Sequence, residues 1–135
     1  MAVNFSESKT KENLMRAFAG ESQARNRYTF AAEQCRREGM QSIGGIFLYT
    51  ADQELAHARR FYELLKPETG TTIFIDGSYP VDEPGSVQDL LQAAAHNENE
   101  EAVDVYPAFA RIAKEEGFYE AASTFMQIAE IEAMH

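Results

Sequence analysis

Residues 129–135 read AEIEAMH, and the stretch ADQELAH occurs 78 residues earlier, at 51–57. In both stretches a glutamate precedes a histidine by three residues. On a helix this spacing puts the two side chains on adjacent turns of one face, so both can reach one metal ion. A single Glu-x-x-His pair is common in helical proteins. Two pairs at a fixed separation predict a duplicated helical unit that carries two related pairs of metal ligands.

The repeat extends beyond these two stretches. The same shift of 78 residues pairs Tyr28 with Tyr106, Glu38 with Glu116, Gly39 with Gly117, Phe47 with Phe125, Ala51 with Ala129, Glu54 with Glu132, and His57 with His135. Each copy consists of two helical stretches that a glycine separates. A duplicated helical hairpin explains this pattern most simply.

These signals predict an all-α fold, an antiparallel four-helix bundle with one long crossover connection between helices 2 and 3. We expect a single domain, 1–135, with helical hairpins at about 10–66 and 86–135 and a crossover at about 67–85. The expected helices are 10–37 with Thr10 as N-cap, 42–66 with Ser42, 86–116 with Ser86 and Asp89 in a capping box, and 118–135.

Two details of this bundle can be tested against a structure. Pro107 falls inside the third helix, where it frees the carbonyl of Val103 and should kink the rod. The crossover contains the apolar run TTIFI, 71–75, which we expect to be extended.

Charge and composition exclude several classes of function. The net charge is −10, from 12 Lys and Arg against 22 Asp and Glu, so nucleic acid and anionic membranes are not expected as partners. Cys35 is the single cysteine, which excludes an internal disulfide framework and a cysteine-based zinc cluster. No apolar run approaches the roughly 20 residues that cross a bilayer, and no secretory signal is visible. We therefore expect a cytoplasmic protein.

Acidic residues interrupt the apolar stripe of every predicted helix. They are Glu21 in the first, Glu54 in the second, Glu98 and Glu101 in the third, and Glu132 in the fourth. Counted from the turns, all lie within roughly one helical turn of a common level. Five buried carboxylates would each cost several kcal/mol of desolvation, so they are either protonated or hold cations. Two divalent metals with oxygen-rich ligands and one imidazole apiece suit iron or manganese.

Three longer stretches carry a family resemblance: AFAGESQARNRY at 17–28, TADQELAHARR at 50–60, and YPAFARIAKEEG at 106–117. With the closing Glu-x-x-His, they make the chain resemble the rubrerythrins, which are ferritin-like di-iron carboxylate proteins. The resemblance implies Glu21 and Glu98 as terminal carboxylates, Glu54 and Glu132 as bridging carboxylates, and His57 and His135 as imidazole ligands. It also implies that one iron shifts between Glu101 and His57 with redox state.

Two tyrosines resemble residues that hydrogen-bond near the cluster in that family. They are Tyr28 and Tyr106. Their stripe positions alone also allow plain core packing.

The resemblance implies a peroxidase that uses two irons, with manganese or zinc as possible substitutes, to reduce hydrogen peroxide to water. Rubrerythrins typically carry a rubredoxin domain with paired C-x-x-C motifs, and this sequence has none. Electrons would then come from a separate rubredoxin-like donor or from another part of a longer native chain. We expect that chain to continue past His135, and we expect a homodimer in which helical hairpins could be swapped.

Three other interpretations stay open at this point. The first is a ferroxidase or oxidase that uses dioxygen, against which Glu101 argues because the resemblance ties the extra carboxylate to peroxide. The second is an iron-binding or storage protein. The third is a helical bundle with no metal.

Overall fold

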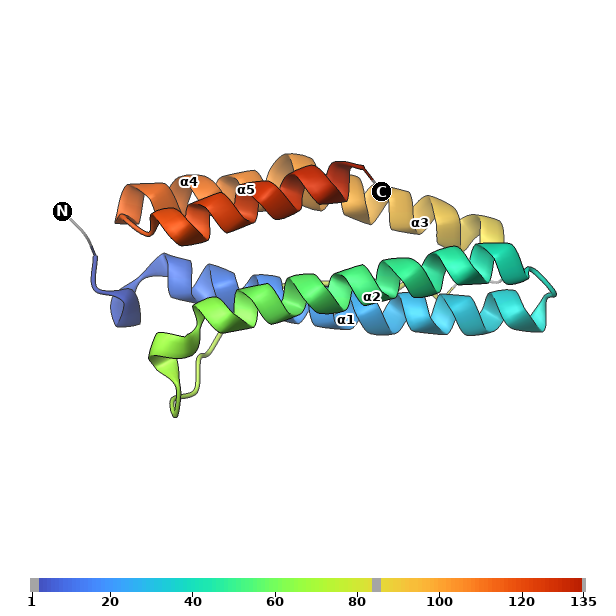
Figure 1. Ribbon diagram of the computed structural model, residues 1–135, viewed down its shortest axis with the longest axis horizontal. Coiled ribbons are helices and arrows are strands. Elements are labelled where there is room, and N and C mark those ends of the chain that lie inside the picture. The colour runs from blue at the N-terminus through green and yellow to red at the C-terminus, as the bar shows by residue number, and fades with distance from the viewer. Residues whose placement is uncertain (1–2, 84–85, 135) are drawn as a thin grey trace.

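Two layers of antiparallel helices make up the computed structural model, which describes residues 3–83 and 86–134 (Figure 1). The first layer is a hairpin of α1 (Lys9–Arg37) and α2 (Gln41–Leu64). The second contains α3 (Val87–Glu100), η3 (Glu101–Val105), α4 (Tyr106–Glu116) and α5 (Tyr119–Ala133), and the short 3₁₀ turns are η1 (Phe5–Glu7) and η2 (Lys66–Glu68). Among the described residues, no helix is long and apolar enough to cross a membrane.

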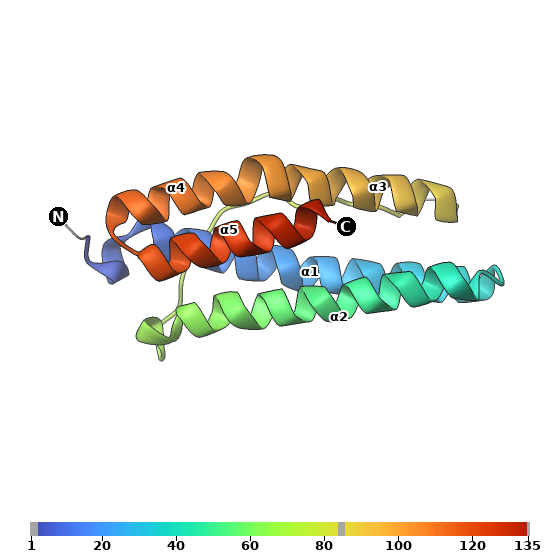
Figure 2. The ribbon, with the colours of Figure 1, turned by 45° about the horizontal axis from the view of Figure 1, so that its top comes forward.

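The crossover connects opposite ends of the bundle. It leaves η2 at one end and reaches the start of α3 at the other, so it runs along the whole length of α1 (Figure 2). This confirms the all-α class and the single long connection between the second and third helical rods. Among the described residues, the backbone of the run 71–75 pairs with no other strand, so this run is not part of a sheet.

Glycines end α1 and α4, as predicted. Gly39 has φ 76° and Gly117 has φ 91°. Both values lie in the left-handed region, which a residue without a Cβ adopts without steric cost. Each glycine therefore allows a tight reversal into the next helix.

The predicted N-caps were right once and wrong twice. Ser86 accepts a hydrogen bond from the backbone N–H of Asp89, as expected. Ser8, rather than Thr10, caps α1, because its hydroxyl accepts from the N–H of Lys11. The second helix begins at Gln41, so Ser42 lies inside it, and Met40 at the cap makes no side-chain bond.

A π-helical turn interrupts the third helical rod. It is η3, and the N–H of Tyr106 bonds to the carbonyl of Glu101 five residues back. A π turn adds one residue to the rod. The turn directly precedes Pro107, which has no N–H for the α-helical bond to Val103. The strain expected from the proline is thus taken up by a wider turn.

The extra residue moves the buried face of the rod by one position. The stripe expected from α-helical spacing contains Val105, Phe109 and Ile112, and all three are only half-buried. The structure instead buries Tyr106, Ala110 and Ala113. The predicted stripe was therefore wrong by one residue after the π turn. The same α-helical spacing predicts Leu91 on the buried face at the start of the rod, but Leu91 is 40% exposed and Leu90 is buried instead.

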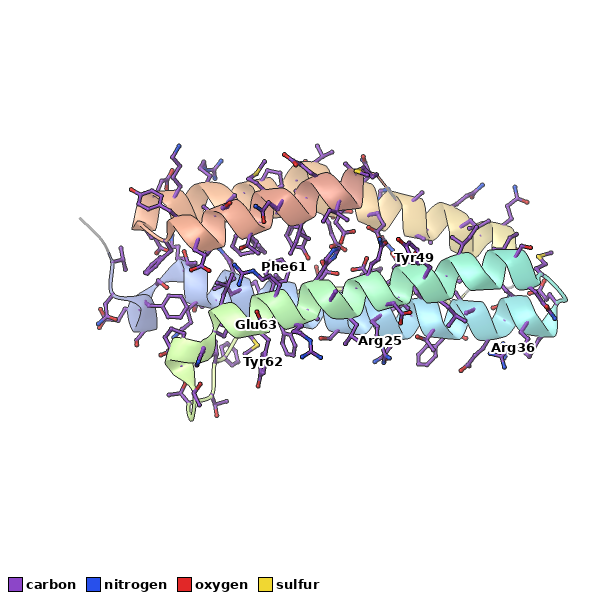
Figure 3. The ribbon with its side chains drawn as sticks, in the orientation of Figure 1. Arg25, Arg36, Tyr49, Phe61, Tyr62 and Glu63 are labelled. Atoms are coloured by element: carbon purple, nitrogen blue, oxygen red, sulfur yellow. The ribbon has the colours of Figure 1, made fainter. Side chains whose placement is uncertain are left out.

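The interior consists of two apolar clusters on either side of a polar layer. One cluster contains Leu14, Phe61, Tyr106 and Phe125, and the other contains Ala24, Cys35, Phe47 and Leu90. Figure 3 shows Phe61 between the two layers, whereas Tyr62 points away from them. The buried acids fall between the clusters along the first three rods, and in α5 the acid follows the last residue of the first cluster. They are Glu21, Glu54, Glu98 and Glu132.

A carboxylate joins the two hairpins at the end opposite the α1–α2 turn. Glu116, at the end of α4, accepts hydrogen bonds from the backbone N–H groups of Lys9 and Thr10 and from the Thr10 hydroxyl. These N–H groups belong to the first turn of α1, where they have no partner inside the helix. Glu116 therefore caps a helix that lies more than 100 residues away in sequence.

Replacing this carboxylate should weaken the fold. We expect Glu116→Ala to lower the free energy of unfolding by about 1–2 kcal/mol, because the N–H groups of Lys9 and Thr10 and the Thr10 hydroxyl lose their acceptor in a partly exposed site. Partial burial raises the pKa of Glu116, but the bonds from Thr10 and the backbone lower it below its usual value. The contribution should be present above about pH 4.5 and lost as the pH falls below it.

Urea unfolding of the wild type and of Glu116→Ala at pH 7 and pH 3.5 measures both effects. Glu115→Ala is a suitable control, since Glu115 is exposed and makes only a surface pair with Arg111. An equal loss in the two variants would contradict the assignment.

Candidate metal centre

Four buried side chains bring their ligand atoms together between the two layers. They are Glu21 of α1, Glu54 and His57 of α2, and Glu132 of α5, whose atoms all lie within 4.8 Å of one another. His57 Nδ1 lies 3.2 Å from Glu132 Oε1, 3.8 Å from Glu21 Oε1 and 4.0 Å from Glu54 Oε2. The imidazole is therefore surrounded by carboxylates from three helices. No single helix could present this set.

Helical spacing explains why these residues meet. Glu54 and His57 are three residues apart on α2, so they share a face that points to the other layer. Glu21 lies on the same buried stripe of α1 as Ala17, Ala24 and Tyr28. Glu132 lies on the stripe of α5 that also contains Phe125 and Ile128. Each acid therefore takes a core position of its helix.

Two further predicted ligands lie on the third rod beside this cluster. Glu98 is buried, with 4% of its surface exposed, and Glu101 opens the π turn. Neither belongs to the four-residue cluster. Both are close enough that the charge of Glu98 raises the pKa of Glu101, and the charge of Glu101 raises that of Glu21. His135, the last predicted ligand, lies outside the described residues.

The two repeat-related tyrosines exchange hydrogen bonds between hairpins. Tyr28 of the first hairpin donates from its hydroxyl to Glu98 Oε1 at 2.8 Å. Tyr106 of the second hairpin donates to Glu21 Oε1 at 2.6 Å. Burial raises the pKa of both hydroxyls above the usual value for tyrosine, so both remain protonated donors. The tyrosines are therefore more than core packing, because each orients a buried acid of the other hairpin.

Burial controls the protonation of the two most affected acids. Desolvation raises the pKa of Glu21 from 4.5 to about 7, although His57 and Tyr106 act in the opposite direction. Desolvation and the charge of Glu98 raise the pKa of Glu101 to about 7 as well. Without a cation, the centre therefore carries protons near neutral pH that ordinary carboxylates would have lost.

The donor set fits divalent metal ions. Glu21 Oε2 and Glu101 Oε2 are buried and make no hydrogen bond to the described residues. A buried carboxylate oxygen without a donor costs free energy that a metal ion would recover. Carboxylates with an imidazole are typical ligands of iron, manganese and zinc in such interiors. The residues present are therefore suited to hold metal.

This fold and interior define a four-helix bundle of the ferritin-like class, with its carboxylates and imidazole at mid-height. A family model described as rubrerythrin matches residues 12–135. The chain belongs to the rubrerythrin family, which confirms the resemblance drawn from its motifs.

Curated relatives and a solved structure agree with this family. The chain is 52% identical over 128 residues to rubrerythrin from Porphyromonas gingivalis, covering 95% of this chain and 62% of the relative. It is 42% identical over 128 residues to rubrerythrin from Nitratidesulfovibrio vulgaris, covering 95% and 65%. A structure of nigerythrin in a partially reduced state superposes with a TM-score of 0.81 at 35% identity, covering 98% and 68%. The chain thus spans about three fifths to two thirds of these relatives.

Sequence reasoning missed the residues that cover the centre from outside. Arg16 and Tyr79 line a cavity that reaches Glu101, and Asp82 of the crossover contacts both Arg27 and Asn97. A cavity and its cover depend on contacts between distant segments, which have no periodic signal in the sequence. The GSYP stretch at 77–80, with a glycine and a proline around an aromatic residue, was the one available hint.

The raised pKa values predict an unusual pH dependence of the metal-free protein. Between about pH 4.5 and 7 the folded state binds more protons than the unfolded chain, so stability should fall as the pH rises through this range. We expect the metal-free protein to melt at least roughly 5 °C lower at pH 8 than at pH 5. Thermal melts followed by circular dichroism, with metal removed by a chelator, measure this difference.

The matched variant is Glu21→Gln. Its amide oxygen can still accept from Tyr106, but the site no longer loses a proton. The metal-free variant should therefore be more stable than the wild type at pH 8 and show a smaller change between pH 5 and 8. A metal-free wild type that gains stability over this range would refute the assignment of buried, protonated acids.

Proposed function

We propose that the chain binds two iron ions in this centre and uses them to reduce hydrogen peroxide to water. Membership of the rubrerythrin family supports an iron-dependent oxidoreductase in general terms. The observation that carries the narrower proposal is a layer of four buried acids to which the half-buried Glu101 adds a fifth carboxylate, beside the cluster of Glu21, Glu54, His57 and Glu132. Manganese or zinc are possible substitutes for iron.

The proposed ligands follow the arrangement of the layer. Glu54 and Glu132 come from facing helices of the two hairpins, which suits them to bridge two ions. Glu21, His57 and Glu101 would hold one ion, and Glu98 with His135 would hold the other. Glu101 and His57 come from opposite layers, so either residue could serve as a ligand of the same ion.

When bound, two adjacent iron(II) ions supply both electrons for the reaction of hydrogen peroxide with two protons to give two water molecules. The chain's own residues orient the metal ligands, exclude water from the centre and supply protons. Tyr28 and Tyr106 hold the terminal carboxylates Glu98 and Glu21 in fixed orientations through their hydroxyls. The apolar clusters on either side exclude bulk water. Glu101 also lines the outer cavity, where its carboxyl group would be placed to pass a proton to the product water.

The proposed partners complete the reaction cycle. Two electrons per peroxide must return to the centre, and we propose a rubredoxin-like protein or domain as their source. We propose a homodimer, with swapped hairpins as one arrangement, because each hairpin supplies only part of the acids, Glu21 and Glu54 from the first and the other three from the second. A cytoplasmic location agrees with the acidic composition and the lone cysteine.

Rapid mixing tests the activity. We expect the anaerobically reduced, iron-loaded protein to be oxidised by hydrogen peroxide at least about tenfold faster than by an equal concentration of dioxygen. Glu101→Gln should slow the peroxide reaction by roughly tenfold or more, because the neutral amide has no negative charge to hold a cation and cannot carry the proton. Stopped-flow absorbance in the near ultraviolet follows both reactions.

Metal analysis is the necessary control. Protein purified without air should contain about two metal ions per chain, and Asp104→Asn, a change in a nearby exposed acid that does not line the cavity beside Glu101, should leave both rates unchanged. Oxidation by dioxygen as fast as by peroxide would favour a ferroxidase. Protein without stoichiometric metal would refute the proposal altogether.

A further inference from the structure

A cavity of about 200 Å³ lies between the crossover and the second layer. At its inner side are Glu101 and Tyr106, which belong to or contact the candidate metal centre. On α1 it is lined by Arg16 and Gly20, and on the crossover by Tyr79. Since one water takes about 30 Å³ in the liquid, the cavity has room for several water-sized molecules.

Exposure shows which end of the cavity opens to solvent. The outer lining residue Tyr79 is 40% exposed, whereas Tyr106 at the inner end is 2% exposed. A molecule that passes Tyr79 therefore moves from solvent to the Tyr106 hydroxyl and the Glu101 carboxylate. Another cavity beside Tyr28 measures about 10 Å³, which is at the lower limit for one water molecule. It is too small to serve as a second route.

The crossover is fastened on both sides of the cavity. On one side Arg16 donates to the backbone carbonyl of Asp76 at 2.9 Å and to its carboxylate at 2.7 Å. On the other side Asp82 accepts from Asn97 at 2.9 Å and lies 3.4 Å from Arg27. Residues 76–82 thus form a strap that α1 and α3 hold at its two ends.

Tyr79 lies at the centre of this strap, on the backbone of α1. Its hydroxyl donates to the carbonyl of Arg16 at 3.2 Å. A Cβ added at Gly20 would meet the Tyr79 ring at 3.5 Å, and one added at Gly77 would meet its hydroxyl at 3.3 Å. The ring is therefore packed between two glycines, and one of them, Gly20, directly precedes Glu21 in the sequence. The absence of side chains at both positions lets it cover the cavity closely.

We propose that this cavity is the route by which hydrogen peroxide reaches the metal centre, and that Tyr79 limits the size of the molecules that pass. The inference rests on the proposed function and adds a residue that determines specificity. Hydrogen peroxide is small and uncharged, so neither the ring nor the neighbouring acids Glu100 and Glu101 oppose its entry. An organic hydroperoxide with a bulky group would have to displace the ring.

Two substitutions at Tyr79 separate its ring from its hydroxyl. Tyr79→Ala removes the ring, and Tyr79→Phe keeps the ring while removing the bond to Arg16. Phe74→Ala is the matched control, because Phe74 is an aromatic residue of the same crossover, is 85% exposed and does not line the cavity. Both sites are exposed, so the fold should tolerate the three changes.

The first measurement is the reaction of reduced, iron-loaded protein with hydrogen peroxide and with cumene hydroperoxide. In Tyr79→Ala we expect the ratio of the cumene hydroperoxide rate to the hydrogen peroxide rate to rise about tenfold or more. In Tyr79→Phe and Phe74→Ala the ratio should stay within about twofold of the wild type. An unchanged ratio in Tyr79→Ala would overturn the proposal.

The second measurement does not depend on catalysis. The rate at which a bulky sulfonated phenanthroline chelator removes iron(II) from the loaded protein should rise several-fold in Tyr79→Ala only. An equal rise in Phe74→Ala would indicate general loosening of the crossover and would count against the route.

The two proposals can fail separately. A wild type that does not react with hydrogen peroxide refutes the proposed function. A reactive wild type in which Tyr79→Ala leaves the ratio of the two rates unchanged refutes the route alone.

Discussion

Burial of several carboxylates at one level is the constraint on which the rest of this structure depends. Apolar clusters on both sides keep Glu21, Glu54 and Glu132 almost free of contact with water. In such surroundings ionised acids are costly unless protons, hydrogen-bond donors or cations compensate. Tyrosine hydroxyls and raised pKa values provide part of that compensation. A metal ion would provide the remainder, so binding of a metal ion should stabilise the fold.

Duplication explains how four helices came to present this layer symmetrically. Each hairpin contributes a tyrosine that donates to an acid of the other hairpin, Tyr28 to Glu98 and Tyr106 to Glu21. Neither hairpin alone could satisfy its own acids. Glu116 adds further hydrogen bonds between the repeats, because it caps the start of α1 from the end of α4. The layer thus joins the two hairpins through hydrogen bonds, in addition to the apolar contacts between them.

The sequence predicted whatever depends on helical periodicity and repetition. The four rods, the crossover, the glycine turns and the level of the acids all follow from spacings along one helix. The buried face after Glu101 did not follow, because a π turn adds a residue and moves that face from Val105 to Tyr106. Pro107 indicated a disturbance but not its form. The cap at Thr10 failed because Ser8 caps α1 while the Thr10 hydroxyl donates to Glu116. The cap at Ser42 failed because α2 begins one residue before it, at Gln41.

The crossover shows where periodic reasoning ends and tertiary contact begins. A centre of this kind has two opposed requirements, since its acids need a dry interior while a substrate must still reach them. A further packed helix in place of the crossover would meet the first requirement and prevent the second. The strap at 76–82 meets both, because it is held by a few polar contacts such as that between the half-exposed Arg16 and the exposed Asp76. Exposed ion pairs contribute little free energy, so such a cover can open locally while the helices beneath it stay folded.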